Sequence, residues 1–354
     1  AGIPTRHDHI MNIILHEFDL PLRHVFTISR GSIDVQKTLI VELQQDGYSG
    51  YGEATTNDYY GFTLENMVRS LEAVRDTITA HQLTDPAELW QLLAPQLNDN
   101  SFAQCALDLA AHDLWGKTRQ QPVHQLWGLD TASIPTSNYT IGIDEIDVMV
   151  HKMQEFPDWP IYKIKLGTPE DVEIVRTLRQ HTEAIFRVDA NCAWSATETI
   201  RNSHLLKELN VEFIEQPMAA DQWEAMRQVK AESVLPVIAD ESCLVESDVA
   251  RCQDCFHGIN IKLVKCGGLT PARRMIQQAR QLELQVMVGC MTESTVGISA
   301  IAQLLPLLDY VDMDGAVLLR EDIASGVTVE AGRCQYPAEN GSGIRLWNPQ
   351  PIPA

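Results

Sequence analysis

The stretch that decides the fold is residues 161–189, IYKIKLGTPEDVEIVRTLRQHTEAIFRVD. It opens with a short apolar run that ends near Lys165 and closes with another that ends at Asp189. The apolar residues that recur at helical spacing between the two runs are Val172, Val175 and Leu178. A strand, a helix with one apolar face and a second strand, in this order, indicate a right-handed crossover between parallel strands.

The same unit recurs along the chain with a polar residue at the end of each run. Asp189, Glu215 and Asp240 follow one another at intervals of 26 and 25 residues. Lys165 lies 24 residues before the first acid, and Lys262 lies 22 residues after the last. Because the carboxyl ends of the strands in a parallel barrel share one rim, these five side chains are expected to converge on one site.

Eight short apolar runs after residue 134 alternate with stretches of helical spacing. The runs lie near 137–142, 161–166, 185–189, 211–215, 236–240, 258–262, 285–289 and 309–313. Eight such repeats predict a closed (β/α)8 barrel of the TIM type rather than an open sheet. The expected fold class is therefore α/β, with a catalytic barrel at residues 131–320.

The rest of the chain is expected to form a second unit. The 354 residues exceed the length of a typical barrel, which is about 250 residues. Residues 1–130 indicate three strands and several helices, which predict an α+β capping domain. Residues 321–354 are rich in Gly and Pro, and we expect them to return to this capping domain.

Composition argues against several kinds of partner and location. The net charge of −21 disfavours binding to nucleic acid or to an anionic membrane. No apolar run approaches the roughly 20 residues of a membrane span, and eight scattered cysteines indicate thiols in a reducing compartment, so we expect a cytoplasmic location. Met11 is a candidate native start, with residues 1–10 then a leader. The oligomeric state stays open, a homo-oligomer included.

The five converging groups suit metal-assisted proton transfer. Asp189, Glu215 and Asp240 offer the oxygen ligands that Mg²⁺ prefers, with Mn²⁺ as the alternative. Lys165 and Lys262 come from opposite sides of an eight-stranded ring, so each would face one side of a substrate between them. One base removing a proton and the other returning one to the far face is the arrangement that inverts a carbon centre.

Four further residues are candidates for the same site. Lys163 and Lys165 are two residues apart on one strand, so both point to one side, and such like charges are expected to lower the pKa of a lysine. Asp312 and Asp314 share a side of the last run, where they suit an ammonium group or, alternatively, a second metal. Glu293 follows the seventh run, where it either orients a lysine or caps a helix.

Together these residues resemble the enolase superfamily, muconate-lactonising subgroup, over essentially the whole chain. The motifs that carry the resemblance are Lys163-Ile164-Lys165, Val188-Asp189-Ala190-Asn191, Glu215-Gln216-Pro217, Ala239-Asp240-Glu241-Ser242 and Asn260-Ile261-Lys262. The pair Asp312 and Asp314 resembles that of the dipeptide epimerases, in which it binds the free ammonium of the dipeptide.

The resemblance implies a reaction and a cofactor. It implies one Mg²⁺ per chain on the three acids, and inversion of the α-carbon of the second residue of a dipeptide through an enolate. Lys165 and Lys262 would be the acid–base pair, and Lys163 would touch the substrate carboxylate. Glu293 is also a candidate substrate-binding residue.

The resemblance also places specificity in two capping-domain loops, near residues 26–33 and 55–61. Arg30 lies near the arginine that pairs with a glutamate side chain in Glu-selective members, and Thr140 is a further candidate contact. The implied substrates are L-Ala-D/L-Glu, from murein peptide recycling, or related L-Ala-L-Xaa dipeptides. Tyr59 and Tyr60 depart from the Glu-selective pattern and leave room for apolar side chains.

Other readings of the same residues stay open. An o-succinylbenzoate synthase or a muconate-lactonising lyase or isomerase would use the same barrel, although its substrate offers no ammonium to Asp312 and Asp314. A sugar-acid dehydratase would want a histidine near the end of the seventh strand. A non-catalytic, ligand-binding barrel is the alternative from another class.

Overall fold

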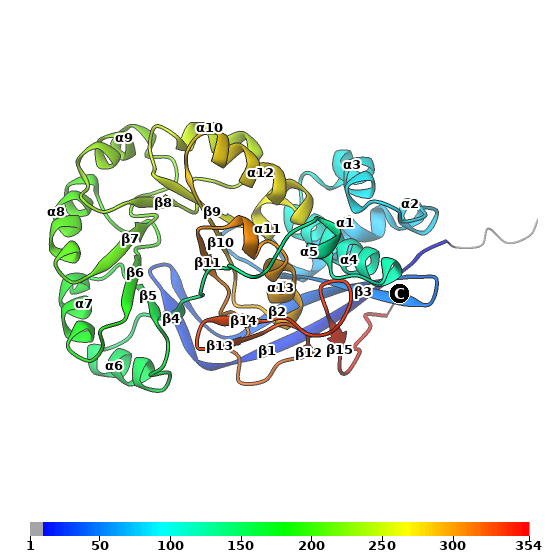
Figure 1. Ribbon diagram of the computed structural model, residues 1–354, viewed down its shortest axis with the longest axis horizontal. Coiled ribbons are helices and arrows are strands. Elements are labelled where there is room, and N and C mark those ends of the chain that lie inside the picture. The colour runs from blue at the N-terminus through cyan, green and yellow to red at the C-terminus, as the bar shows by residue number, and fades with distance from the viewer. Residues whose placement is uncertain (1–9, 354) are drawn as a thin grey trace, which may run out of the picture.

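The computed structural model describes residues 10–353, in which a three-stranded sheet with its helices adjoins a barrel (Figure 1). The antiparallel sheet consists of β1 (Asn12–Ile28), β2 (Gly31–Gln45) and β3 (Tyr48–Thr55). Asp46 and Gly47, at φ 53° and 82°, form the two-residue turn between β2 and β3, since tight hairpins favour positive φ there. The β1–β2 hairpin, in blue in Figure 1, extends to the barrel, where Ile143 N donates to Thr27 O at 2.8 Å.

Five helices accompany this sheet. They are α1 (Leu64–Ala73), α2 (Arg75–Thr79), α3 (Pro86–Leu97), α4 (Ser101–Arg119) and α5 (Val123–Leu126). Asn100 caps α4, because its side chain accepts a hydrogen bond from Ala103 N. The helix lies so close to β3 that a Cβ on Gly52 would stand 2.0 Å from Ala106 O.

The barrel contains the eight strands that the sequence predicts, and all neighbouring strands in it are parallel. They are β4 (Tyr139–Ile141), β5 (Ile161–Lys165), β6 (Ile185–Asp189), β7 (Val211–Glu215), β8 (Val237–Ala239), β9 (Gly258–Lys262), β10 (Gln285–Gly289) and β11 (Tyr310–Asp312). The ring closes between its first and last strands through a parallel bridge from Ser137 to Val311. The barrel interior below the rim includes a buried cluster of Phe213, Ile238 and Met287.

Helices follow the strands and form the outer layer seen in Figure 1. They are α6 (Ile146–Gln154), α7 (Asp171–Arg179), α8 (Ala196–Lys207), α9 (Trp223–Glu232), α10 (Glu246–Cys252), α11 (Leu263–Cys266), α12 (Leu269–Gln281), α13 (Thr295–Ala302) and the 3₁₀ helix η1 (Leu305–Leu307). Among the described residues no helix has both the length and the apolar character to span a bilayer.

The C-terminal residues return to the N-terminal part of the molecule. Their short strands are β12 (Ala324–Ser325), β13 (Thr328–Glu330), β14 (Arg333–Gln335) and β15 (Arg345–Leu346). Ser342 N donates to Asp113 Oδ1 at 2.8 Å, and Ile352 N donates to Leu15 O at 2.8 Å. The domain limits at residues 130 and 320 stay a prediction, and the expected leader falls mostly on residues 1–9, outside the described residues.

Candidate active site

Three buried carboxylates converge at the carboxyl rim of the barrel. Asp189 and Glu215 are the last residues of β6 and β7, and Asp240 directly follows β8. In the register of the sheet Asp189 pairs with Glu215, which places their side chains at the same level. One oxygen of each acid lies within 4.8 Å of one oxygen of each of the others. The convergence expected from the 25- and 26-residue spacing is therefore present.

Two lysines bracket this cluster. Lys165 ends β5, and its Nζ lies 2.9 Å from Asp189 Oδ2. Lys262 ends β9, and its Nζ lies 2.8 Å from Asp240 Oδ2. Since β5 and β9 are four strands apart in a ring of eight, the two amines approach the acids from opposite sides.

Lys163 lies deeper in the same barrel and pairs with several acids. Its Nζ stands 2.8 Å from Asp312 Oδ2, 3.3 Å from Glu215 Oε1 and 3.4 Å from Asp189 Oδ2. Burial alone would lower the pKa of Lys163, but the charges of these three acids outweigh it and raise the pKa well above its usual value. The expectation that neighbouring lysines lower the lysine pKa is wrong for Lys163, because its carboxylate partners are nearer and more numerous.

Burial close together shifts the pKa values of the three acids. Burial and the charge of Asp189 raise the pKa of Glu215 to about 8, although Lys163 opposes this shift. Burial raises the pKa of Asp189 and Asp240 as well, but their lysine partners outweigh it and hold both pKa values below the usual range. The lysines compensate only part of the repulsion among these buried carboxylates. A hard divalent cation would compensate the rest, because carboxylate oxygens are its preferred ligands.

Asp312 and Asp314 form a second acidic pair on the cavity wall. Asp312 Oδ1 accepts from Asn138 Nδ2 at 3.0 Å, and Asp314 Oδ2 accepts from the backbone N of Thr140. Burial, then the charge of Asp312, raises the pKa of Asp314 well above its usual value. These two acids and Cys290 also present ligand atoms within 4.8 Å of one another, so the geometry leaves the alternative of a second metal open.

The groups surround a cavity of about 650 Å³ between the rim and the capping loops. Its polar lining from the barrel includes Thr140, Lys163, Lys165, Asp240, Lys262, Asp312 and Asp314. Its lining from the capping part includes Phe26, Ile28, Arg30, Ile33, Val35, Tyr59 and Tyr60. A cavity of this size, lined by apolar, aromatic and many polar side chains, fits a small polar organic ligand.

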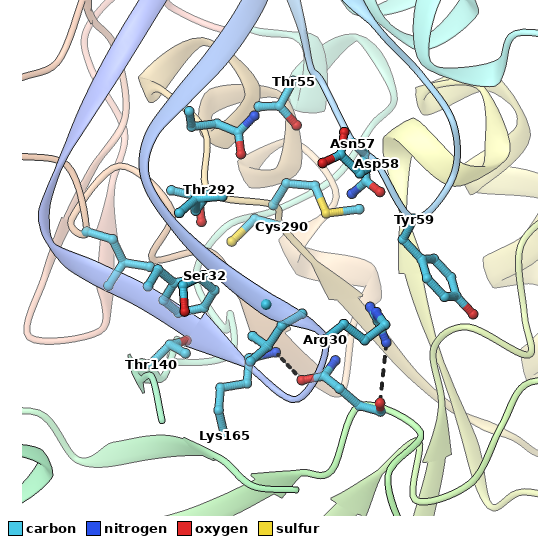
Figure 2. Close-up of a pocket in the computed structure, with 18 of the residues that line it drawn as sticks. Arg30, Ser32, Thr55, Asn57, Asp58, Tyr59, Thr140, Lys165, Cys290 and Thr292 are labelled. Carbon is cyan, nitrogen blue, oxygen red and sulfur yellow. Dashed lines mark hydrogen bonds between the residues drawn. The ribbon is translucent and has the colours of Figure 1, made fainter. Parts of the chain in front are cut away.

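Arg30 reaches the cavity from the tip of the β1–β2 hairpin, as Figure 2 shows. Its guanidinium donates to Glu241 Oε2 at 2.6 Å and lies over the ring of Tyr59, 4.1 Å from the centroid. The predicted arginine is therefore at the cavity, but its charge is opposed by a buried acid. Glu241 was not among the predicted residues, and no local pattern points to a partner 211 residues away.

Glu293 does not line this cavity. It is buried in the wall behind, beside Gly297, and its neighbour Thr292 lines the cavity instead. A direct contact between Glu293 and a substrate does not follow from this position. Burial, followed by the charge of Glu53, raises the pKa of Glu293 well above its usual value.

Supporting residues to which the sequence analysis assigned no role hold the acids in place. Lys265 is buried, and its Nζ donates to Asp240 Oδ1 at 2.8 Å and to three backbone carbonyls. Asn260 Nδ2 donates to Glu215 Oε2 at 3.2 Å. The signal that could have found Asn260 is its place two residues before Lys262, on the same face of β9.

A capped barrel with three buried acids between two lysines belongs, by fold and site, to the class of metal-binding (β/α)8-barrel enzymes. The comparison with known proteins then narrows this class.

The chain belongs to the mandelate racemase and muconate lactonizing enzyme family of the enolase superfamily. Residues 11–128 match the mandelate racemase / muconate lactonizing enzyme N-terminal domain, and residues 148–349 match the enolase C-terminal domain-like family. The resemblance inferred from the sequence motifs is thereby confirmed.

Similar proteins are named as epimerases. The L-Ala-D/L-amino acid epimerase of Flavobacterium johnsoniae is 58% identical over 336 residues, covering 95% of this chain and 100% of that protein. The L-Ala-D/L-Glu epimerase of Bacteroides thetaiotaomicron is 38% identical, covering 94% and 88%. A crystal structure of a dipeptide epimerase from Cytophaga hutchinsonii, complexed with Mg and the dipeptide D-Ala-L-Val, superposes with a TM-score of 0.90 at 26% identity, covering 96% of each chain.

Proposed function

We propose that this protein is a Mg²⁺-dependent dipeptide epimerase, which inverts the α-carbon of the second residue by two-base 1,1-proton transfer. The observation that carries the proposal is the placement of Lys165 and Lys262 on opposite sides of the carboxylate cluster. The epimerase names and the Mg and dipeptide of the similar proteins support the same reaction.

In this proposal the two lysines exchange roles with the direction of reaction. One lysine, as the amine, takes the α-proton from its own face, and the electron pair of the broken C–H bond delocalises into the adjacent carboxylate. The other lysine, as the ammonium, returns a proton to the opposite face, and a new C–H bond forms with inverted configuration. Asp189, Glu215 and Asp240 would hold a divalent cation, which would supply positive charge against the negative charge that develops on the substrate.

The remaining polar residues orient the substrate. Asp312 and Asp314, on the wall formed by β11 and the residues after it, bind the free ammonium of the first residue. Lys163, buried between the metal ligands and Asp312, holds the positive charge that faces the substrate carboxylate. Thr140 shapes the wall next to the ammonium site through its bond to Asp314.

The ammonium site is what favours an epimerase over the alternatives. A lactonising enzyme or an o-succinylbenzoate synthase has no use for two buried acids at this position. No histidine is among the described residues that line the cavity, which argues against a histidine-based dehydratase. All five groups of the predicted acid–base and metal set are present and converge, which argues against a non-catalytic barrel.

The side chain of the second residue is proposed to be uncharged. The part of the wall nearest Arg30 includes the aromatic rings of Tyr59 and Tyr60, and the guanidinium of Arg30 already has a carboxylate partner in Glu241 at 2.6 Å. A glutamate substrate would have to compete with this partner. We therefore favour L-Ala-D/L-Xaa dipeptides with apolar Xaa over L-Ala-D/L-Glu.

Role and location depend on this specificity. The predicted part in murein peptide recycling requires turnover of L-Ala-D-Glu, so it stays a prediction, as does the homo-oligomer. The eight cysteines carry no disulfide, which supports the prediction of a reducing, cytoplasmic location.

Deuterium incorporation from D₂O tests the proposed reaction and the substrate together. The Mg²⁺-loaded protein is incubated in D₂O with a library of L-Ala-L-Xaa dipeptides, and the products are measured by mass shift. Each accepted dipeptide is expected to gain a single deuterium, at the α-carbon of its second residue, together with the opposite configuration. The absence of exchange for every dipeptide offered would overturn the proposal.

A further inference from the structure

We propose that Asn191 is the positioning residue of Lys165, and that it links the seating of the β1–β2 hairpin tip to the base on one face of the substrate. The inference rests on the proposed function, because it assigns each lysine to one face of the α-carbon.

The amide of Asn191 directly contacts the amine. Lys165 Nζ donates to Asn191 Oδ1 at 3.2 Å, and Asn191 is almost wholly buried. The second partner of this Nζ is Asp189 Oδ2, which belongs to the proposed metal ligands. A carboxylate favours the ammonium form of a lysine, whereas a neutral amide oxygen orients the amine with much less bias between its protonation states. Asn191 therefore orients the amine of Lys165 without favouring one of its protonation states.

The backbone at Asn191 and Cys192 has an uncommon, left-handed conformation. Asn191 and Cys192 have φ values of 44° and 72°, in the left-handed region, which asparagine tolerates better than cysteine and most other non-glycine residues. Asn191 N donates to Asp189 Oδ1 at 2.9 Å, and Cys192 N donates to Gln216 O at 2.9 Å. Such a conformation persists only where the surrounding residues impose it. The direction of the Asn191 amide therefore depends on the residues that pack around it.

The hairpin tip supplies part of these surroundings. Ser29 Oγ donates to Asn191 O at 2.9 Å, and Arg30 Nη1 donates to the same oxygen at 3.3 Å. Figure 2 shows two dashed bonds, one from Lys165 and one from Arg30, that meet on one residue below the hairpin. Gly167 gives the tip its room, since a Cβ there would stand 2.7 Å from Ser29 Cβ. Hairpin tip, Asn191 and Lys165 thus form one continuous chain of contacts.

The opposite lysine lacks this connection. Among the described residues Lys262 Nζ has a hydrogen bond to Asp240 only, and that acid is anchored from behind by Lys265. Arg30 of the hairpin bonds to the neighbouring Glu241, but no described hairpin residue bonds to Lys262 or to Asp240. The link through Asn191 therefore acts on one face of the substrate alone.

The test uses exchange measured separately from each epimer. Asn191→Gly removes the amide while keeping positive φ accessible, and Ser29→Ala removes the hydroxyl bond from the hairpin. Lys165→Ala identifies which epimer depends on Lys165. Asp34→Ala is the matched control, an exposed carboxylate on the same hairpin with no bond to Asn191.

We expect Asn191→Gly to slow α-proton exchange about 10²-fold for the epimer that Lys165→Ala blocks, since small misplacements of a reacting group cost about this much. Exchange from the other epimer should change little. Ser29→Ala should act on the same epimer with a smaller effect, and Asp34→Ala should match the wild type. Thermal unfolding and Mg²⁺ titration calorimetry verify folding and metal affinity.

Equal loss from both epimers, or loss from the epimer that Lys262 serves, would overturn the inference. If Asn191→Gly fails to fold, Ser29→Ala decides the matter by the same comparison. An inactive wild type would instead refute the proposed epimerase, so the two failures are distinguishable.

Discussion

Asp314→Asn isolates the charge that we assign to ammonium recognition. The substitution keeps the size of the side chain, and the amide oxygen of Asn can still accept from the backbone N of Thr140. The ion pairs of Lys163 reach Asp189, Glu215 and Asp312 but not Asp314. Among the described residues, Asp314 is therefore the acid of the pair that has no lysine partner.

The size of the effect follows from the burial of this site. Asp314 is 1% exposed, so its contact with an ammonium would be shielded from water. A hydrogen bond to a charged partner contributes about 1.5–3 kcal/mol, which corresponds to a loss of roughly 10- to 150-fold in kcat/KM at about 1.4 kcal/mol per factor of ten. We expect the loss mainly in KM, because the ammonium lies away from the carbon that changes configuration.

The pH dependence supplies an independent check. Burial and the neighbouring Asp312 raise the pKa of Asp314, so it holds a proton at low pH and must release it to bind an ammonium. The affinity of the wild type for dipeptides should accordingly rise with pH above the ordinary carboxyl range, and this limb should vanish in Asp314→Asn.

The assay is the initial rate of deuterium uptake at several dipeptide concentrations and pH values. Asp34→Asn, an exposed carboxylate on the β1–β2 hairpin, controls for the change in net charge. Unchanged kcat/KM and an unchanged acid limb in Asp314→Asn would refute the assignment of the ammonium site.

Three further predictions concern metal, specificity and packing. Asp189→Asn should abolish turnover and weaken Mg²⁺ binding in titration calorimetry; full activity of the wild type after chelation would contradict the metal site. Glu241→Gln should free the guanidinium of Arg30 and raise the ratio of kcat/KM for L-Ala-L-Glu over L-Ala-L-Leu about tenfold. An unchanged ratio would show that Glu241 does not affect substrate preference. Gly52→Ala should lower the free energy of unfolding by about 1–3 kcal/mol, because the added methyl group pushes α4 away from the sheet. The measurement is the melting temperature, which should fall; an unchanged value would show that α4 can move without a loss of stability.

The barrel was predictable because its signal is local and repeated. Each βα unit carries its own apolar run and helical stretch, and parallel strands have one way to close with helices outside. The convergence of Asp189, Glu215 and Asp240 follows from the same regularity. It needs no knowledge of contacts, only of which end of each strand carries the polar residue.

Other features of the site depend on contacts between distant segments. Arg30 and Glu241 meet only because the hairpin crosses the barrel mouth, and the resemblance placed the arginine there without its partner. Glu293 immediately follows residues that line the cavity, yet its side chain is in the wall behind. The like charges of Lys163 and Lys165 were expected to lower a lysine pKa, but the pKa of Lys163 rises, because the charges of three acids from other strands outweigh the effect of burial.

The amino-acid order alone determined the parallel barrel, the rim on which its acids and lysines gather, and hence the kind of chemistry. Periodicity and strand ends are properties of short segments, so they can be predicted from the sequence alone. Only the tertiary structure decided how charges are shared and which side chains the cavity accepts. Both properties depend on contacts between residues that are remote in the chain, such as Arg30 with Glu241 at 2.6 Å and Lys165 with Asn191 at 3.2 Å. The physical reason is that electrostatic and hydrogen-bond energies depend on distance in space and not on separation along the chain.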